Sequence, residues 1–211
     1  MLTKFILFDA FGTLLRITNG RHPYRQILKE GIRQGRRPQP DDLRQILTRN
    51  LDLPGAADAF GINIQPGQMA DIQADLEADL CAIEAYEDGL RAIETLQAEG
   101  IKIAVASNLA APFVAPVRRL FPTVDAYGFS FAIGAMKPDP FLYRATCELL
   151  GVDTSCYSGG AQVVMIGDSK KCDHDGPNAV GIRGFLLNRL GGKGFNNLIQ
   201  FSDMVLGSRS E

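Results

Sequence analysis

The sequence has no large excess of charge of either sign and no long hydrophobic run. Its 22 Lys and Arg residues against 24 Asp and Glu residues leave a net charge of −2 over 211 residues. The chain therefore lacks the basic field typical of nucleic-acid-binding proteins, and we expect no nucleic-acid partner. No apolar stretch approaches the roughly 20 residues that cross a bilayer, so we expect no membrane partner. The composition, 45% hydrophobic and 22% charged, is that of a soluble globular protein.

Cysteine is scarce and shows no paired spacing. The scattered positions argue against a disulfide framework or a zinc site and favour reduced thiols. The four residues are Cys81, Cys147, Cys156 and Cys172. A single lysine precedes the first apolar run and no small-residue cleavage site follows it, so we expect no signal peptide and a cytoplasmic protein.

The first segment of the chain combines an apolar run with one carboxylate. Residues 5–8 are apolar and aromatic, which is typical of a buried strand in a parallel sheet. The run stops at Asp9, and Gly12 and Thr13 break the pattern just beyond. A carboxylate at the carboxyl end of a core strand lies where open α/β sheets bind ligands, and its burial calls for a cation or hydrogen-bond donors. The alternative is that Asp9 only caps a following helix.

The next part of the chain is patterned as helices. We expect residues 17–86 to form a small all-helical cap inserted between two parts of one core domain, residues 1–16 and 87–211. Prolines and glycines divide this segment into short helices and loops, and a second long helix is expected over 70–85. The first helix has an apolar stripe at helical spacing, made of Tyr24, Ile27, Leu28 and Ile32.

A row of basic residues lies beside that stripe, each four residues from the last. Like charges at this spacing repel, so the row requires a partner. One interpretation is that acidic residues of the second helix, or water, face these side chains. The other is that some of them overhang Asp9 and attract an anionic substrate. The row consists of Arg21, Arg25, Lys29 and Arg33.

From residue 89 onward, strand patterns alternate with helix patterns. The predicted strands cover residues 101–106, 126–131, 162–166 and 182–187, and the predicted helices cover 112–120, 141–150, 176–180 and 195–201. We expect Asp139 to cap the helix over 141–150, with Pro140 in its first turn. Gly100 closes an earlier helix whose apolar face is Leu90, Ile93 and Leu96. Strands separated by helices predict an α/β fold with a parallel sheet and right-handed crossovers.

Polar residues follow the ends of three predicted strands. Asp9 follows the first, Ser107 and Asn108 follow the second, and Asp168 follows the fourth. Because parallel strands place their carboxyl ends at one edge, these residues can converge there with Lys137, which precedes a helix. Two carboxylates can hold a divalent cation such as Mg²⁺, and Ser107, backbone N–H groups and Lys137 can bind an anion. Asp173 is placed to brace the metal ligands or to pair with a lysine.

These segments, in this order, resemble the four motifs of the haloacid dehalogenase-like (HAD) superfamily. Residues 8–14 resemble the first motif, Ser107-Asn108 the second, Lys137-Pro138 the third, and residues 167–173 the fourth. The resemblance implies a Rossmann-like three-layer core with a parallel sheet, and Asp9 as a nucleophile that forms a covalent intermediate. It also implies phosphate contacts from Thr13, Ser107, Asn108 and Lys137. Mg²⁺ would be held by Asp9, Asp168 and the backbone carbonyl of Phe11.

Phe11 departs from the pattern of the superfamily's phosphatases, which carry a proton-transferring Asp two residues after the nucleophile. Three functions therefore stay open: a Mg²⁺-dependent phosphatase or phosphotransferase for a small anionic metabolite, a metal-free 2-haloacid dehalogenase, or a metal- and phosphate-binding protein with little turnover. Asp168 favours the first, because a second carboxylate beside Asp9 would blunt the nucleophile unless a cation lay between them. His22 and His174 form no convincing pair, and we expect His174 in a solvated loop rather than as a substitute acid. We expect a monomer or a homodimer.

Overall fold

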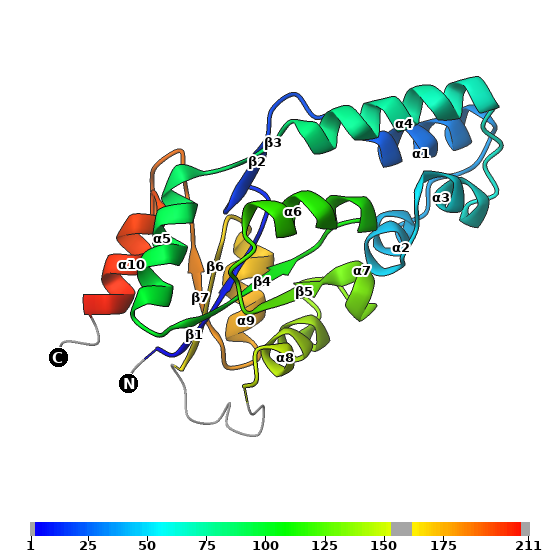
Figure 1. Cartoon of the computed structure of the whole chain (residues 1–211). Coiled ribbons are helices and arrows are strands. Elements are labelled where there is room, and N and C mark those ends of the chain that lie inside the picture. Colours follow the sequence, from blue (N-terminus) through cyan, green and yellow to red (C-terminus); the bar gives the residue numbers. More distant parts are fainter. Residues whose placement is uncertain (1–2, 153–161, 208–211) are drawn as a thin grey trace.

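A five-stranded parallel sheet forms the centre of the protein (Figure 1). The computed structural model describes residues 3–152 and 162–207. In the sheet the strands lie in the order β5-β4-β1-β6-β7, and every neighbouring pair is parallel. Their bounds are Phe5–Phe8 for β1, Lys102–Ser107 for β4, Ala126–Phe129 for β5, Val163–Gly167 for β6 and Arg183–Leu186 for β7. The predicted α/β fold is confirmed.

Strand β1 occupies the middle of the sheet because all of its side chains are apolar. Ile6, Leu7 and Phe8 are fully buried, and Phe8 pairs in register with Val105 on one side and Ile166 on the other. Successive side chains of a strand point to opposite faces, so a strand covered on both faces reads as a continuous hydrophobic run. This position places Asp9, the next residue, at the centre of the sheet's carboxyl edge.

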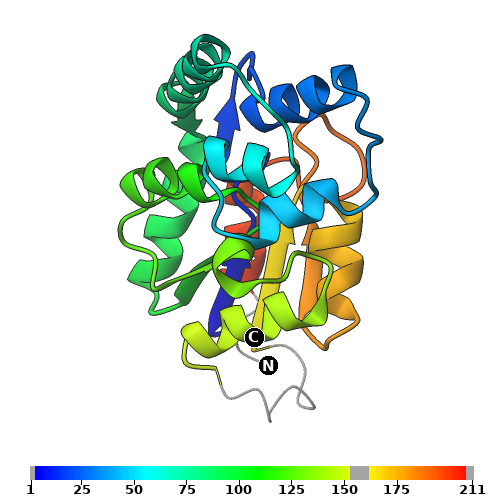
Figure 2. The same cartoon turned by 90° about the vertical axis from the view of Figure 1, so that its right-hand side faces the viewer.

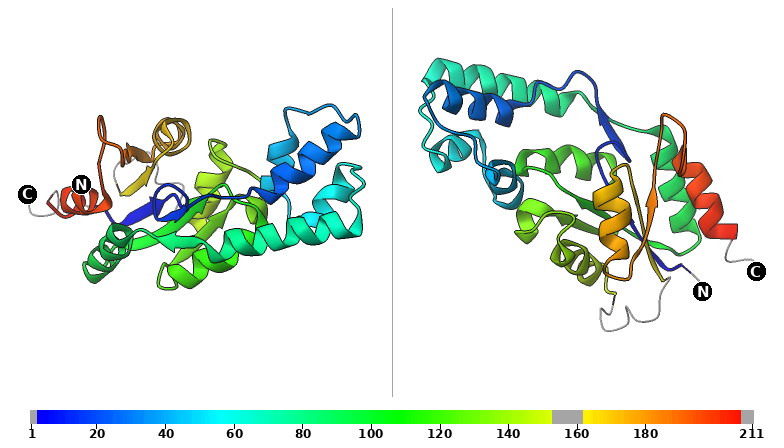
Figure 3. Two further views of the ribbon diagram at one scale, coloured as in Figure 1. Left: turned by 90° about the horizontal axis from the view of Figure 1, so that it is seen from above. Right: turned by 180° about the vertical axis from the view of Figure 1, so that it is seen from behind.

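Helices cover both faces of the sheet and give three layers (Figures 2 and 3). Ile6 and Phe8 face one cluster, into which α5, α6 and α10 pack, while Leu7 faces a second cluster containing α8. Helices α5 and α10 lie side by side (Figure 3). Their bounds are Glu87–Ala98 for α5, Val114–Leu120 for α6, Pro140–Leu149 for α8, Gly176–Asn178 for α9 and Leu198–Gly207 for α10.

Four helices form a separate apolar cluster beyond the carboxyl edge of the sheet (Figure 1). These are α1 (Pro23–Arg33), α2 (Asp42–Thr48), α3 (Leu53–Ala59) and α4 (Pro66–Cys81). Helix α2 also contacts α7, the short core helix Ser130–Ile133. The helical insertion therefore lies against the core; the exact domain boundaries stay a prediction.

The expectation of an all-helical insertion was wrong at its connection to the core. Strands β2 (Leu15–Ile17) and β3 (Ile83–Ala85) pair as a two-stranded antiparallel sheet. The long helix was expected over 70–85, but α4 ends at Cys81 and the chain then becomes extended. The reason is the pairing itself: residues 83–85 satisfy their backbone groups with a segment 68 residues away, which no local helical pattern reveals.

Other differences concern one side chain and the ends of two elements. Leu90 was expected on the buried face of α5 but is 44% exposed, whereas Ile93 and Leu96 are buried there as expected. Strand β5 stops at Phe129, because α7 begins at the next residue. Helix α10 begins at Leu198 rather than at residue 195. The Asp139 cap is confirmed: its side chain accepts a 2.9 Å hydrogen bond from the backbone N–H of Phe141.

Cys81 and Cys172 are free thiols, no disulfide joins either of them to Cys147, and Cys156 lies outside the described residues. Within residues 3–152 and 162–207, every helix is too short or too polar to cross a bilayer.

Candidate active site

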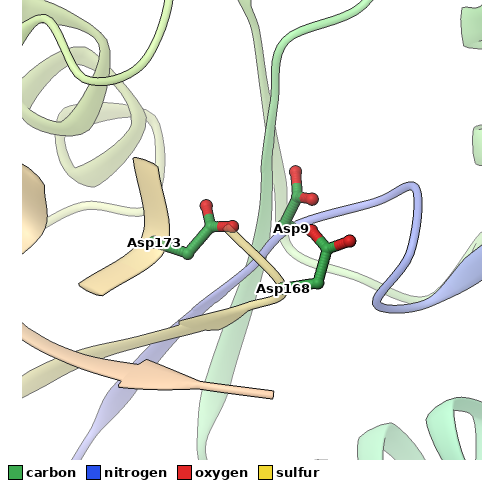
Figure 4. Close-up of side chains that lie close together, drawn as sticks. All are labelled: Asp9, Asp168 and Asp173. Carbon is green, nitrogen blue, oxygen red and sulfur yellow. The ribbon is translucent and has the colours of Figure 1, made fainter. Parts of the chain in front are cut away.

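Three carboxylates converge at the carboxyl edge of the sheet (Figure 4). Asp9 follows β1, Asp168 follows β6, and Asp173 lies in a π-helical turn over Lys170–Asp175. One oxygen of each lies within 4.8 Å of the others. The sequence therefore identified residues that the fold brings together from positions up to 164 residues apart in the chain.

Lys137 neutralises part of this negative charge. Its Nζ lies 2.7 Å from Oδ1 of Asp9 and 2.6 Å from Oδ1 of Asp173. Lys137 is 2% exposed and Asp9 is 8% exposed, so little water screens the three charges. Desolvation alone would lower the pKa of Lys137, but the two carboxylates more than offset it and raise that pKa above its ordinary value. Lys137 therefore stays charged throughout the physiological range.

Asp173 is held on both of its oxygens. Oδ1 accepts from Lys137, and Oδ2 accepts a 2.9 Å hydrogen bond from the backbone N–H of Ser169. Burial raises the pKa of Asp173 to about 6, with the Asp9 charge adding to the effect and Lys137 opposing it. Both oxygens of Asp173 are therefore occupied. Of its two expected roles, bracing the metal ligands or pairing with a lysine, the structure shows the pairing, with Lys137.

Gly12 lies close against the carboxylate of Asp168. Gly12 has φ +83°, and a Cβ at this position would lie 2.1 Å from Oδ2 of Asp168. Desolvation and the Asp9 charge raise the pKa of Asp168. Two neighbouring carboxylates whose ionised forms destabilise each other favour a cation between them. Oxygen ligands of this kind suit Mg²⁺, and Asp9 and Asp168 are the two residues that fit this role.

The side chain of Asn108 is hydrogen-bonded to the backbone of Lys137. Its Nδ2 donates to the carbonyl oxygen of Lys137 at 3.0 Å, and its Oδ1 accepts from the Lys137 N–H at 2.7 Å. A side-chain amide matches a peptide unit in this way, so Asn108 fixes the backbone of Lys137. Ser107 is buried at the end of β4, beside this pair. The expected contact of Asn108 with phosphate stays a prediction.

Thr13 lies inside the loop that follows Asp9. Its side chain is fully buried, and Oγ1 has no hydrogen-bond partner in the described part of the chain. Thr13 lies in a tight turn in which its N–H donates to the carbonyl of Ala10. The expected contact of Thr13 with phosphate stays a prediction.

Phe11 places an aromatic ring where a proton donor would otherwise follow the nucleophile. Its ring meets that of Phe113 edge to face, with centroids 5.9 Å apart. Phe113 in turn packs against the apolar cluster of helices α1–α4 as well as against the core. The loop after Asp9 is thereby joined through two phenylalanines to the helical insertion.

Two residues of the basic row, Arg21 and Arg33, have acidic partners. Arg21 forms an ion pair with Asp75 of α4, and Asp79 of the same helix accepts hydrogen bonds from the backbone N–H groups of Arg21 and His22. Facing acidic residues therefore partner this end of the row, as the first interpretation predicted. Arg33 pairs with Glu30 on its own helix.

The two middle residues of the row and the second histidine lie at the surface. Arg25 and Lys29 are exposed, and their attraction for an anionic substrate stays a prediction. His174 contacts Asp175 at 2.8 Å through Nδ1. Its side chain is partly exposed, in keeping with the expected solvated loop histidine.

Arg189 was missed by the sequence reasoning. It lies on the loop after β7, and its guanidinium donates to the carbonyl oxygens of Gly12 and Thr13. The sequence did contain a signal for it: polar residues that follow the carboxyl ends of parallel strands gather at one edge of the sheet, and Arg189 follows the end of β7. It was overlooked because its partners on the nucleophile loop are 176 and 177 residues away in the sequence.

Comparison with known proteins places this site in a family. The model of the haloacid dehalogenase-like hydrolases matches residues 3–181. The chain belongs to the haloacid dehalogenase-like hydrolases. Among curated proteins, it is 32% identical over 113 residues to Phosphatase MT3486 of Mycobacterium tuberculosis, covering 51% of this chain and 48% of that protein. The match thus spans about half the length of that relative.

Solved structures of HAD proteins share the fold. A HAD phosphatase from Thermococcus onnurineus superposes with a TM-score of 0.64 and 22% identity, covering 98% of each chain. A HAD family enzyme of Bacteroides thetaiotaomicron, in complex with magnesium and inorganic phosphate, gives 0.62 and 15% identity over 90% of this chain and 97% of that one. L-2-haloacid dehalogenase from Xanthobacter autotrophicus gives 0.59 and 19% over 91% and 80%. At these identities the likeness shows the fold alone, and HAD phosphatases and dehalogenases share it.

Proposed function

We propose that this HAD hydrolase is a Mg²⁺-dependent phosphatase or phosphotransferase that acts on a small anionic phosphorylated metabolite. The observation that carries the proposal is the convergence of Asp9 and Asp168, which bring carboxylate oxygens within 4.8 Å of each other. A halide leaves without a cation, whereas transfer of a phosphoryl group to a carboxylate brings two anions together. The retained carboxylate therefore favours phosphoryl chemistry.

In the proposed reaction Asp9 is the nucleophile, and Lys137 and Ser107 bind the phosphoryl group. An oxygen of Asp9 attacks phosphorus, and the bond to the leaving oxygen breaks with its electron pair on that oxygen. Water then attacks the phosphorus of the aspartyl-phosphate, and the bond from Asp9 to phosphorus breaks with its electron pair on the Asp9 oxygen. The proton of the water passes to solvent or stays on the inorganic phosphate that leaves. Lys137 neutralises charge on Asp9 and on the phosphoryl oxygens, and Ser107 donates to those oxygens. When bound between Asp9, Asp168 and the Phe11 carbonyl, Mg²⁺ supplies electrostatic stabilisation of the transferred group.

Phe11 limits the substrates that this mechanism serves well. General acid catalysis contributes typically about 10²–10⁴-fold, and a phenyl ring supplies none. We expect the best substrates to be those whose leaving group departs without a proton, such as acyl phosphates and aryl phosphates.

A second candidate function is a 2-haloacid dehalogenase, and Phe11 is the observation that favours it. Halide departs without protonation, so the missing proton donor costs that reaction nothing. Both candidates use Asp9 as nucleophile and differ in the need for the cation that Asp168 would hold. A protein that binds Mg²⁺ and phosphate with little turnover is the third possibility.

One assay separates these functions. Purified protein with 5 mM Mg²⁺ is given a panel of phosphate esters that includes acetyl phosphate and p-nitrophenyl phosphate, and 2-chloropropionate is tested in parallel. We expect phosphate release that EDTA stops and that is lost in Asp9→Asn. Phosphate release that is equal in EDTA contradicts the proposal, chloride release without metal supports the dehalogenase, and Mg²⁺-dependent binding of a phosphate analogue without turnover supports the binding protein.

A further inference from the structure

Arg189 contacts the backbone of the nucleophile loop from outside the catalytic cluster. Its Nη2 donates to the carbonyl oxygen of Thr13 at 2.6 Å, and its Nε donates to the carbonyl oxygen of Gly12 at 3.3 Å. These carbonyls belong to the two residues that follow Phe11, whose own carbonyl is the third proposed oxygen ligand. One side chain thus holds two consecutive residues of the segment that would carry the metal.

Arg189 is itself held in place by two other side chains. Asp88, near the start of α5, accepts from Nη1 at 3.0 Å and from Nη2 at 3.1 Å. The guanidinium carbon lies 3.7 Å from the centre of the Tyr86 ring. Asp88 also accepts a 2.8 Å hydrogen bond from the backbone N–H of Leu198. A planar guanidinium with a bidentate partner and an aromatic ring has little freedom to move.

The position of Gly12 makes this support relevant to the metal site. Gly12 lies against the Asp168 carboxylate, where even one added carbon would lie 2.1 Å from Oδ2. Its N–H donates to the carbonyl of Leu15 at 2.8 Å, which closes the loop on the inner side. A small shift of Gly12 therefore changes the separation between the loop and Asp168, and with it the spacing of the oxygen ligands.

We propose that Arg189 is a positioning residue that sets the Mg²⁺ affinity of the site by fixing the carbonyl groups of Gly12 and Thr13. Asp88 and Tyr86 serve the same purpose by orienting the guanidinium. The inference rests on the proposed Mg²⁺-dependent function of this site. Partners that orient metal ligands without touching the metal typically change affinity by about 10–100-fold when removed.

The chain offers a matched control for this inference. Arg16 also pairs with a carboxylate, Glu84, at 2.8 Å and also lies over the Tyr86 ring, at 5.7 Å from its centre. It is exposed, and its hydrogen bonds go to Glu84. Arg16→Ala removes the same charge and the same kind of ring contact, but it removes none of the hydrogen bonds from Arg189 to the carbonyl oxygens of Gly12 and Thr13.

The experiment measures Mg²⁺ binding directly by isothermal titration calorimetry of the full chain, with the melting temperature recorded for each variant. We expect Arg189→Ala to raise the Mg²⁺ dissociation constant at least about tenfold and Arg16→Ala to leave it within twofold. Arg189→Lys keeps the charge but loses the planar fork, so its dissociation constant should lie between those of the wild type and Arg189→Ala.

Several outcomes would overturn the inference. A folded Arg189→Ala variant with wild-type Mg²⁺ affinity and only a lower melting temperature would make Arg189 merely structural. An equal shift in Arg16→Ala would make the effect one of overall charge. If Arg189→Ala does not fold, Arg189→Lys decides by the same measurement, and wild-type affinity in that variant contradicts the inference. If the wild type binds Mg²⁺ but releases no phosphate, the proposed function is contradicted, whereas the role of Arg189 is still decided by the Mg²⁺ dissociation constants of its variants. A wild type that binds no Mg²⁺ contradicts both the proposed function and the role of Arg189.

Discussion

Replacing Lys137 by methionine should destabilise the protein strongly. The change keeps most of the volume of the side chain but removes the cation that lies 2.7 Å from Asp9 and 2.6 Å from Asp173. Removing one partner of a buried ion pair costs about 3–5 kcal/mol, because the other charge stays buried without compensation. For a chain of this length, about 1 kcal/mol corresponds to roughly 2–4 °C in Tm. We therefore expect Lys137→Met to lower the melting temperature by roughly 6–20 °C.

The sign of the pH dependence follows from the pKa of Lys137. That pKa is raised above its ordinary value of 10.5, so the stabilisation by Lys137 is fully present below that value and is lost only as the pH rises through the higher folded-state value. The difference between wild type and Lys137→Met should therefore not shrink through deprotonation of Lys137 at neutral pH. Added Mg²⁺ should restore part of the loss, because it supplies another cation to Asp9.

The control is Lys170→Met, which removes an exposed lysine paired with Asp175 two residues beyond Asp173. Exposed pairs contribute little, so its melting temperature should stay close to that of the wild type. Differential scanning calorimetry at neutral pH in EDTA measures both variants. If the two variants melt together, the buried charges are not coupled as the distances imply, and the reasoning is refuted.

The remaining predictions concern the loop, the metal and the insertion. Gly12→Ala should weaken Mg²⁺ binding, because a Cβ at this position would displace the Asp168 carboxylate, whereas Gly61→Ala, also at positive φ but with nothing within 4 Å, should affect only stability. Phe11→Asp should speed hydrolysis of alkyl phosphates by about 10²-fold relative to aryl phosphates; an unchanged ratio of rates would contradict the role given to Phe11. Because the pKa of Asp168 is raised, protons compete with Mg²⁺ for this carboxylate. Calorimetry should therefore show that the Mg²⁺ affinity decreases as the pH is lowered, beginning at a pH above the ordinary carboxyl pKa of about 3.9. Lys29→Ala should raise KM for anionic substrates, and an unchanged KM would assign Lys29 to a solvated surface.

Much of the site was predictable because it follows one geometric rule. Asp9, Ser107 and Asp168 each end a parallel strand, and Lys137 precedes a helix at the same edge, so their convergence follows from topology alone. The apolar run before Asp9 also predicts the central position of β1, since a strand buried on both faces must be hydrophobic throughout.

What could not be predicted depends on contacts between distant segments. Residues 83–85 form a strand only because Leu15–Ile17 lies beside them, and three residues are too few for a period to show. Asn108 spends its amide on the backbone of Lys137, a choice set by how closely two loops approach. Thr13 is buried by the turn in which it lies, and Arg189 reaches the nucleophile loop across the fold.

The connection between insertion and core has a mechanical consequence. Strand β2 starts at Leu15, the residue whose carbonyl accepts from the Gly12 N–H, and β3 returns the chain to Tyr86 beneath Arg189. The pair of strands that carries the chain into and out of the helical insertion is thus hydrogen-bonded to the loop after Asp9. A displacement of the insertion relative to the core would therefore reach the nucleophile loop through the backbone of Leu15.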